Sequence, residues 1–221
     1  MAEFAVVLLD GQRLAGPLAA STGVPVVPSS VADHLEVAAE VGTEVELVVG
    51  LATVPWPAHP DLHAEGSARL PAYTGVVSWH ALPTLLDALA VAVEPAARRG
   101  AHVLVTAPDP GPDTAAEDVL FLREVAEGIA ERTALPSRSI AWRGQTRTPT
   151  AEAALASLVG AHERRDVLEC PVAPGTGADP SLEAAAAELG LRFTCADVGR
   201  GVLLDALSEV VRTVAGHEGA L

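Results

Sequence analysis

Short apolar runs alternate with segments of helical periodicity along the second half of the chain. Residues 102–107, HVLVTA, are an apolar run bounded by PDPGPD, which is typical of a buried strand. Residues 114–132 place Val119, Leu122 and Val125 at helical spacing and predict a helix. The same signals predict strands at 137–142, 167–173 and 191–196, and helices from Thr148 or Thr150 to about 160, at 180–189 and at 201–215. This strict alternation of strand and helix predicts a parallel sheet that is covered on both faces.

The first half follows the same order in a less regular form. Apolar runs predict strands at 4–9, 24–27, 45–54 and 74–79, and helical spacing predicts helices at 30–41 and 83–98. We expect residues 10–23 to be too short and too glycine-rich for a full helix, because glycine and proline disfavour helices. Residues 55–71, PWPAHPDLHAEGSARLP, predict a long loop or a broken helix.

Two stretches of the chain repeat at about half its length. Residues 84–93, TLLDALAVAV, match residues 202–211, VLLDALSEVV, at six of ten positions without a gap. In the same order, AHPDL at 58–62 corresponds to ADPSL at 178–182. Internal repeats mark duplicated folding units. We therefore predict an α/β protein of two tandem flavodoxin-like units, each a four-stranded parallel sheet flanked by helices, with halves at 1–98 and 99–221.

Charge and composition narrow the possible partners. The chain has 221 residues and a formal net charge of −15, and its basic residues are all arginine. Without a basic face, it is not expected to bind nucleic acid or an anionic membrane surface. Its apolar runs are too short to span a bilayer, and its first residues do not resemble a signal peptide. Since Cys170 and Cys195 are the only cysteines, we expect no disulfide framework and a reducing, cytoplasmic location.

Candidate ligand-binding residues follow from the predicted fold. In open parallel sheets, ligands bind beyond the carboxyl ends of the strands. These ends are expected at 10–13, 55–63, 79–83, 108–112 and 174–180. Three of the seven histidines, His59, His63 and His80, lie in these segments. Each is either a ligand or an ordinary packed or solvated side chain, and the sequence favours neither.

A metal site is one hypothesis for these histidines. His59 and His63 are four residues apart and would share one face of a helix, although Pro57 and Pro60 disfavour a regular helix there. Imidazole suits Zn²⁺, Co²⁺ or Fe²⁺, whereas Mg²⁺ and Ca²⁺ prefer oxygen ligands. Asp10 could add an oxygen ligand or accept protons.

Other residues carry weaker signals. The glycines of GTG at 175–177 predict a turn, and the two cysteines are expected to be core thiols. Trp56, Trp79 and Trp142 lie at or just past strand ends. They either line a pocket for a flat ligand or cap the core.

The order of these motifs resembles the class II chelatases, which insert a divalent metal into a tetrapyrrole. LLDGQRLAG (8–16) is similar to the first strand and histidine motif of the sirohydrochlorin chelatases, and AHPDL (58–62) and WHALPTLLDAL (79–89) are similar to two later motifs. In the second half, LEAAAAELGLRF (182–193) resembles a late helix and strand of the ferrochelatases.

Two departures from the family pattern distinguish the halves. Asp10 stands at the position of the first metal-binding histidine of the sirohydrochlorin enzymes, and Pro108 stands at the catalytic histidine position of the ferrochelatases. His59 matches the second histidine position. The resemblance therefore implies a structural second half and a first half that carries the site.

The implied activity is insertion of a divalent metal into a tetrapyrrole precursor such as sirohydrochlorin. The metal (Co, Fe or Ni) is a substrate, and no organic cofactor is implied. His59 and His63 are expected to bind the metal, and Asp10 and His80 to accept protons or assist. The candidate substrate-binding residues are Arg13, Trp56 and Arg143.

Two other functions stay open. One is a lapsed chelatase homologue that binds metal, tetrapyrrole or a partner protein without catalysis, which the lost family histidines favour. The other is an unrelated small-molecule enzyme, since a flavodoxin-like sheet does not by itself define a function. A homodimer is compatible with each.

Overall fold

The chain divides into two compact units, the first formed by residues 1–79 and 203–221 and the second by residues 80–202. The computed structural model describes residues 4–9, 12–30, 33–45, 47–52, 73–77, 82–109, 118–161, 166–172 and 177–218. In this part of the chain, no helix is both long and apolar enough to cross a membrane.

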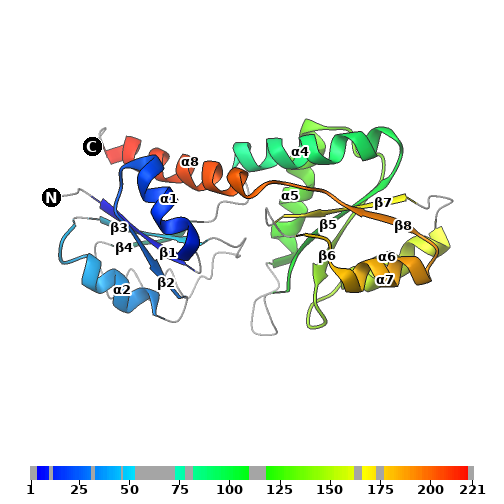
Figure 1. Cartoon of the computed structure of the whole chain (residues 1–221), viewed down its shortest axis with the longest axis horizontal. Helices are drawn as coiled ribbons and strands as arrows, with labels where there is room; N and C mark the ends of the chain where they lie inside the picture. Colours follow the sequence, from blue (N-terminus) through cyan, green and yellow to red (C-terminus); the bar gives the residue numbers. More distant parts are fainter. Residues whose placement is uncertain are drawn as a thin grey trace. The chain divides into compact units, whose positions relative to one another are not determined.

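The first unit is a parallel sheet with helices on both faces (Figure 1). Its strands are β1 (Phe4–Leu9), β2 (Val26–Ser29), β3 (Leu47–Ala52) and β4 (Tyr73–Val77), in the order β2-β1-β3-β4. Its helices include α1 (Gln12–Thr22), α2 (His34–Val41) and α8 (Arg200–Glu218), which begins at the unit boundary. Ala38 of α2 packs against Val7, Leu9 and Val48 on one face of the sheet, and α1 and α8 lie on the other. Every residue of β1 is buried, which explains its continuous apolar run.

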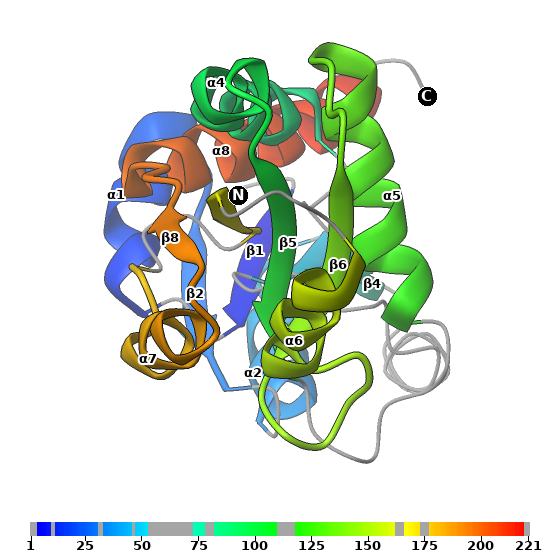
Figure 2. The same ribbon diagram turned by 90° about the vertical axis from the view of Figure 1, so that its right-hand side faces the viewer.

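The second unit repeats this architecture. Its strands are β5 (His102–Pro108), β6 (Arg138–Arg143), β7 (Asp166–Pro171) and β8 (Arg192–Cys195), in the order β6-β5-β7-β8. Its helices include α4 (Pro83–Arg98), α5 (Asp118–Arg132), α6 (Ala151–Ala161) and α7 (Pro180–Glu188). Helices α6 and α7 pack on one face, around Leu104, Leu155 and Leu182. Helices α4 and α5 cover the other face, and Figure 2 shows α5 beside β6.

The two sheets have the same strand order, and all their strand pairs are parallel. The prediction of two four-stranded parallel units flanked by helices is therefore confirmed. The repeated sequence corresponds to repeated packing, because Leu89 and its counterpart Leu207 are both fully buried, while Asp87 and Asp205 are both exposed.

One element was missed by the sequence pattern. Residues 10–23 were expected to be too short for a full helix, yet Gln12–Thr22 form α1. Ala15 and Leu18 of this helix are buried, and Leu18 is 0% exposed. Packing of these two side chains on the unit outweighs the low helix propensity of Gly16 and Pro17, because most helix stability in proteins comes from tertiary contacts.

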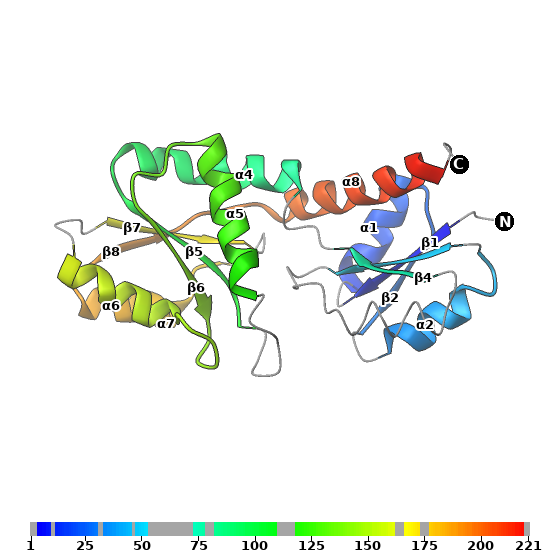
Figure 3. The same cartoon turned by 180° about the vertical axis from the view of Figure 1, so that it is seen from behind.

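The two helices that carry the LLDAL repeat lie in exchanged positions relative to the expected halves. The halves 1–98 and 99–221 follow sequence order, which would place α4 in the first unit and α8 in the second. Instead, α4 packs on β5, β7 and α5 of the second unit. Helix α8 belongs to the first unit, where it lies beside α1 (Figure 3). Ser208 Oγ of α8 lies 2.8 Å from Ser21 Oγ of α1. The sequence does not show which unit each helix joins, because the two helices have the same pattern of apolar residues.

Candidate functional site

Three adjacent strands of the first unit lead into the predicted site segments. Strands β1, β3 and β4 are neighbours in the sheet, with Leu9 paired to Ala52 and Leu51 paired to Val77. Their carboxyl ends therefore lie at one edge. The candidates that follow these ends in the sequence lie outside the described residues; they are Asp10, Trp56, His59, His63 and His80.

Arg13 is the one predicted site residue of the first unit that the structure describes. It lies in the first turn of α1, directly after the carboxyl end of β1, and its side chain is exposed. Its charge is thus available at the edge of the sheet where ligands of open α/β sheets bind.

The second unit carries a buried polar cluster at the corresponding edge. We name it the Arg143–Glu169 cluster, formed by Thr106, Arg143, Glu169 and Cys195. Arg143 Nε donates to Glu169 Oε1 at 2.6 Å, and Thr106 Oγ1 donates to the same oxygen at 2.8 Å. Cys195 is the register partner of Glu169 in the neighbouring strand. Because Thr106 and Glu169 belong to β5 and β7, the cluster spans the point where the strand order reverses.

Glu169 is the most constrained member of this cluster. It is 0% exposed, and its Oε2 has no hydrogen-bond partner among the described residues. A buried carboxylate is tolerated only when it is paired, so Arg143 is the group that keeps Glu169 inside the sheet. Sequence reasoning missed Glu169, although a carboxylate in the apolar run VLECPVA was a signal for a buried polar partner.

Arg143 donates hydrogen bonds to two residues and is largely enclosed. Its side chain is 10% exposed, and its Nη2 also donates to the carbonyl oxygen of Gly177 at 3.1 Å. Burial lowers the pKa of Arg143, but the hydrogen bond and charge of Glu169 outweigh this effect, so the pKa is raised overall. The guanidinium is therefore permanently charged, and Glu169 balances that charge.

Both thiols have a pKa above the ordinary value, so they are protonated and weakly nucleophilic near neutral pH. Burial, with added repulsion from Cys195 and Glu169, raises the pKa of Cys170 to about 12. Burial and then Glu169 raise the pKa of Cys195 to about 11, against the opposing effect of Arg143. Cys170 is buried as expected of a core thiol, whereas Cys195 is only half-buried.

Two carboxylates shape the loops around the cluster. Asp109 follows β5 and accepts hydrogen bonds from Thr146 N at 2.7 Å and Arg147 N at 3.2 Å. Asp179 caps α7 by accepting from Ser181 N at 2.9 Å. The Ser181 side chain, together with smaller contributions that include Arg143, lowers the pKa of Asp179.

The described residues do not contain a metal centre. Pro108 ends β5, and no group of three or more His, Cys, Asp or Glu side chains among these residues could hold a metal ion. Among the described residues at the carboxyl edge of the second unit, the polar groups are thus a buried ion pair with adjacent thiol and carboxylate groups.

The strand order and helix positions of both units are flavodoxin-like, and the fold of the chain is similar to that of a class II chelatase. SirB from Bacillus subtilis, in a structure with Fe³⁺, superposes with a TM-score of 0.69 at 14% identity, covering 99% of this chain and 98% of that one. A sugar ABC transport substrate-binding protein from Bordetella parapertussis 12822 has a TM-score of 0.53 at 17% identity, covering 99% and 81%. No family model and no curated protein matches the sequence. At these identities the likeness concerns the fold.

Proposed function

We propose that this protein inserts a divalent metal into a tetrapyrrole precursor such as sirohydrochlorin. The observation that carries the proposal is the similarity to SirB with Fe³⁺, which extends over nearly the whole of both chains. The motif resemblance of the first half points in the same direction.

The proposed reaction centre lies at the carboxyl edge of the first unit. His59 and His63 would hold the incoming metal, since imidazole binds Co²⁺, Fe²⁺ and Ni²⁺ but exchanges them. Two pyrrole N–H protons leave as the metal enters, and Asp10 and His80 would accept them. The convergence of β1, β3 and β4 supports this assignment, because the segments that carry these residues start from neighbouring strand ends.

The proposed substrate carries many carboxylates, so its binding needs positive charge within an acidic protein. Arg13 is exposed at the edge of the first unit and is the better placed arginine. Arg143 is neutralised by Glu169, so we expect it to contribute less to substrate affinity. Trp56 would contact the macrocycle. The two free thiols are in keeping with a reducing, cytoplasmic location.

A lapsed homologue that binds tetrapyrrole or metal without catalysis is the second candidate. Asp10 and Pro108 replace two family histidines, which favours this alternative. An absorption experiment separates the two. Purified protein is mixed with sirohydrochlorin, and Co²⁺ or Fe²⁺ is then added.

Insertion faster than the protein-free rate is the result we expect. A spectral shift on mixing, followed by insertion at the protein-free rate, would assign the protein to the binding class instead. If neither the spectrum nor the rate changes, metal insertion and tetrapyrrole binding are both excluded.

A further inference from the structure

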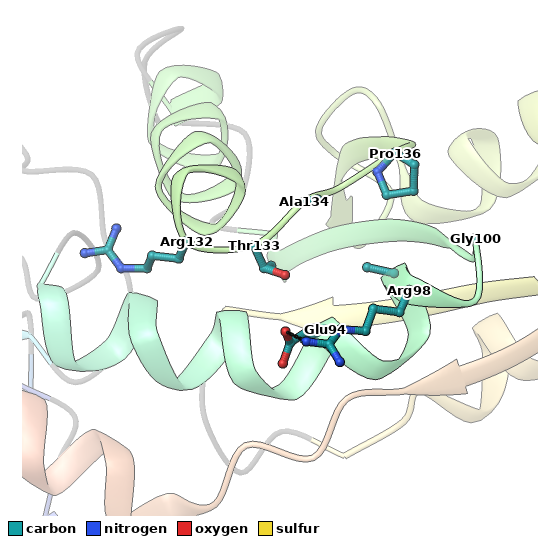
Figure 4. A pocket seen from close by; sticks show the side chains of 8 residues that line it. Glu94, Arg98, Gly100, Arg132, Thr133, Ala134 and Pro136 are labelled. Carbon is teal, nitrogen blue, oxygen red and sulfur yellow. Dashed lines mark hydrogen bonds and ion pairs between the residues drawn. The ribbon is translucent and has the colours of Figure 1, made fainter.

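A surface hollow of about 580 Å³ lies in the second unit, where α4 and α5 end. Its walls include Glu94 and Arg98 of α4 and Thr133, which follows α5. Figure 4 shows Glu94 and Arg98 side by side, while Arg132 points away from them. Because α4 leads into β5 and α5 into β6, the hollow lies at the amino ends of these strands, at the opposite end from the Arg143–Glu169 cluster. A hollow of this volume suits a small molecule.

Positive charge gathers around this hollow in a chain whose net charge is −15. Arg98 and Arg99 lie at the end of α4, and Arg132 ends α5. Arg138 begins β6 and pairs in register with Val103, at the same end of the sheet. A local concentration of guanidinium groups attracts anions. Two guanidinium groups, Arg98 and Arg132, and one carboxylate, Glu94, line the hollow, so its lining carries a net positive charge within an acidic chain.

Arg98 can change its partner at little cost. Its Nη2 lies 2.6 Å from Glu94 Oε1, and the two side chains are 76% and 42% exposed. An exposed ion pair of this kind contributes little to stability. Arg132, in contrast, is fixed by Asp87 Oδ1 at 2.6 Å and by the carbonyl oxygen of Gly128 at 2.9 Å. Arg98 is thus the movable cation and Arg132 a fixed one.

The carbonyl oxygens at the end of α4 do not need the guanidinium of Arg98 as a hydrogen-bond donor. The backbone N–H groups of Arg99 and Gly100 donate to Ala96 O at 3.1 Å and Ala97 O at 2.9 Å. Gly100 makes this closure with a φ of 81°, a conformation that favours glycine. Since these terminal carbonyls already have donors, Arg98 is available to a ligand.

We propose that this hollow binds a small organic anion, with its carboxylate or phosphate group on Arg98. The anion would replace Glu94 on the guanidinium, and the hydroxyl of Thr133 would donate a second hydrogen bond. The remaining walls include Ala97, Ala134 and Pro136, which suit an apolar body rather than a bare ion. This site is independent of the proposed chelatase centre, which belongs to the first unit.

The test titrates the ¹⁵N-labelled full chain with benzoate and with phenyl phosphate at constant ionic strength. Benzamide serves as the uncharged control. We expect saturable shifts of the amide signals of Gly100, Thr133 and Ala134 with both anions and none with benzamide. Equal responses to benzoate and benzamide would overturn the proposal. A response to one anion alone identifies which of the two groups the site takes.

Three variants test whether the anion binds at Arg98. Arg98→Gln should weaken binding about fivefold, whereas Glu94→Gln should tighten it about twofold, because it removes the competing carboxylate. Arg192→Gln is the matched control, since Arg192 is 77% exposed and paired with Asp166 but does not line the hollow. If Arg98→Gln and Arg192→Gln weaken binding equally, the anion is attracted to the general surface charge and the site does not exist.

Discussion

At the scale of single residues, Glu169 is fully buried and is paired with Arg143. Replacing it by glutamine would leave the charge of Arg143 buried without a counter-charge, a change that typically costs about 3 kcal/mol. We therefore predict that Glu169→Gln lowers the free energy of unfolding by about 2–4 kcal/mol in urea titrations. Glu188→Gln, at an exposed position at the end of α7, is the control and should change it by less than about 0.5 kcal/mol.

Replacing both Arg143 and Glu169 tests whether the ion pair itself stabilises the fold. Well-packed apolar residues often replace a buried ion pair without loss of stability. Arg143→Met combined with Glu169→Leu should therefore be more stable than Glu169→Gln alone. If the double variant is the less stable one, the ion pair itself contributes to the stability of the fold.

The two thiols predict a loss of stability in alkaline solution. Their pKa values in the folded chain, about 12 for Cys170 and about 11 for Cys195, lie above the ordinary value of 9.0. The stabilising contribution of the protonated thiols is complete below pH 9 and is lost as the pH rises through these values. The free energy of unfolding should fall by up to about 1 kcal/mol per pH unit and per thiol across this window.

The composition of the chain makes the effect of the two thiols easy to distinguish in this pH window. The chain has no lysine and a single tyrosine, so few other groups titrate between pH 9 and 12. Urea titrations of Cys170→Ala at several pH values should show a flatter decline than the unsubstituted chain. Identical slopes for the two proteins would show that Cys170 is not a cause of the decline.

At the scale of elements, the loop after β6 depends on one glycine. Gly144 has a φ of 150°, and a Cβ atom there would lie 2.3 Å from Asp109 Cβ. Gly144→Ala would therefore force Asp109 away from the amides of Thr146 and Arg147. We predict a loss of about 1–3 kcal/mol in thermal or urea unfolding. Gly177→Ala, with nothing within 4 Å of the added carbon, should be close to neutral.

Most elements were predictable because their burial is regular. The strand at 4–9 and the helix at 83–98 have the expected bounds, since one is buried at every position and the other has a continuous apolar stripe. Helix α1 was not predictable, because its stability depends on where Leu18 packs and not on its own propensities. Glu169 was missed for a similar reason, since only the register brings Arg143 to it.

At the scale of the whole molecule, the repeat fixes the architecture but not the assignment of its helices. The two sheets share one strand order, as is expected of the duplicated units that the LLDAL repeat predicted. Helix α8 packs in the first unit and α4 in the second. The two helices have nearly the same pattern of apolar residues, so the sequence does not show which unit each one joins. Of the predicted site, the structure describes Arg13 and Arg143, and the other residues lie outside the described part of the chain.

Hydrogen exchange tests this assignment of helices. Leu207 of α8 and Leu89 of α4 are both 0% exposed, and truncating either to alanine should cost about 2–4 kcal/mol. Leu207→Ala should speed exchange in β1 and β3, and Leu89→Ala should speed it in β5 and β7. Each variant is the control for the other. The reverse pattern would contradict the division into units.

We propose that the first unit performs metal insertion through His59, and one rate comparison tests this proposal most directly. The initial rate of Co²⁺ insertion into sirohydrochlorin is measured for the unsubstituted chain, for His59→Ala and for His217→Ala, a histidine in the last helix. We predict that His59→Ala falls to the protein-free rate, a loss of about tenfold or more, while His217→Ala keeps the full rate. Equal rates for all three proteins would contradict the claim.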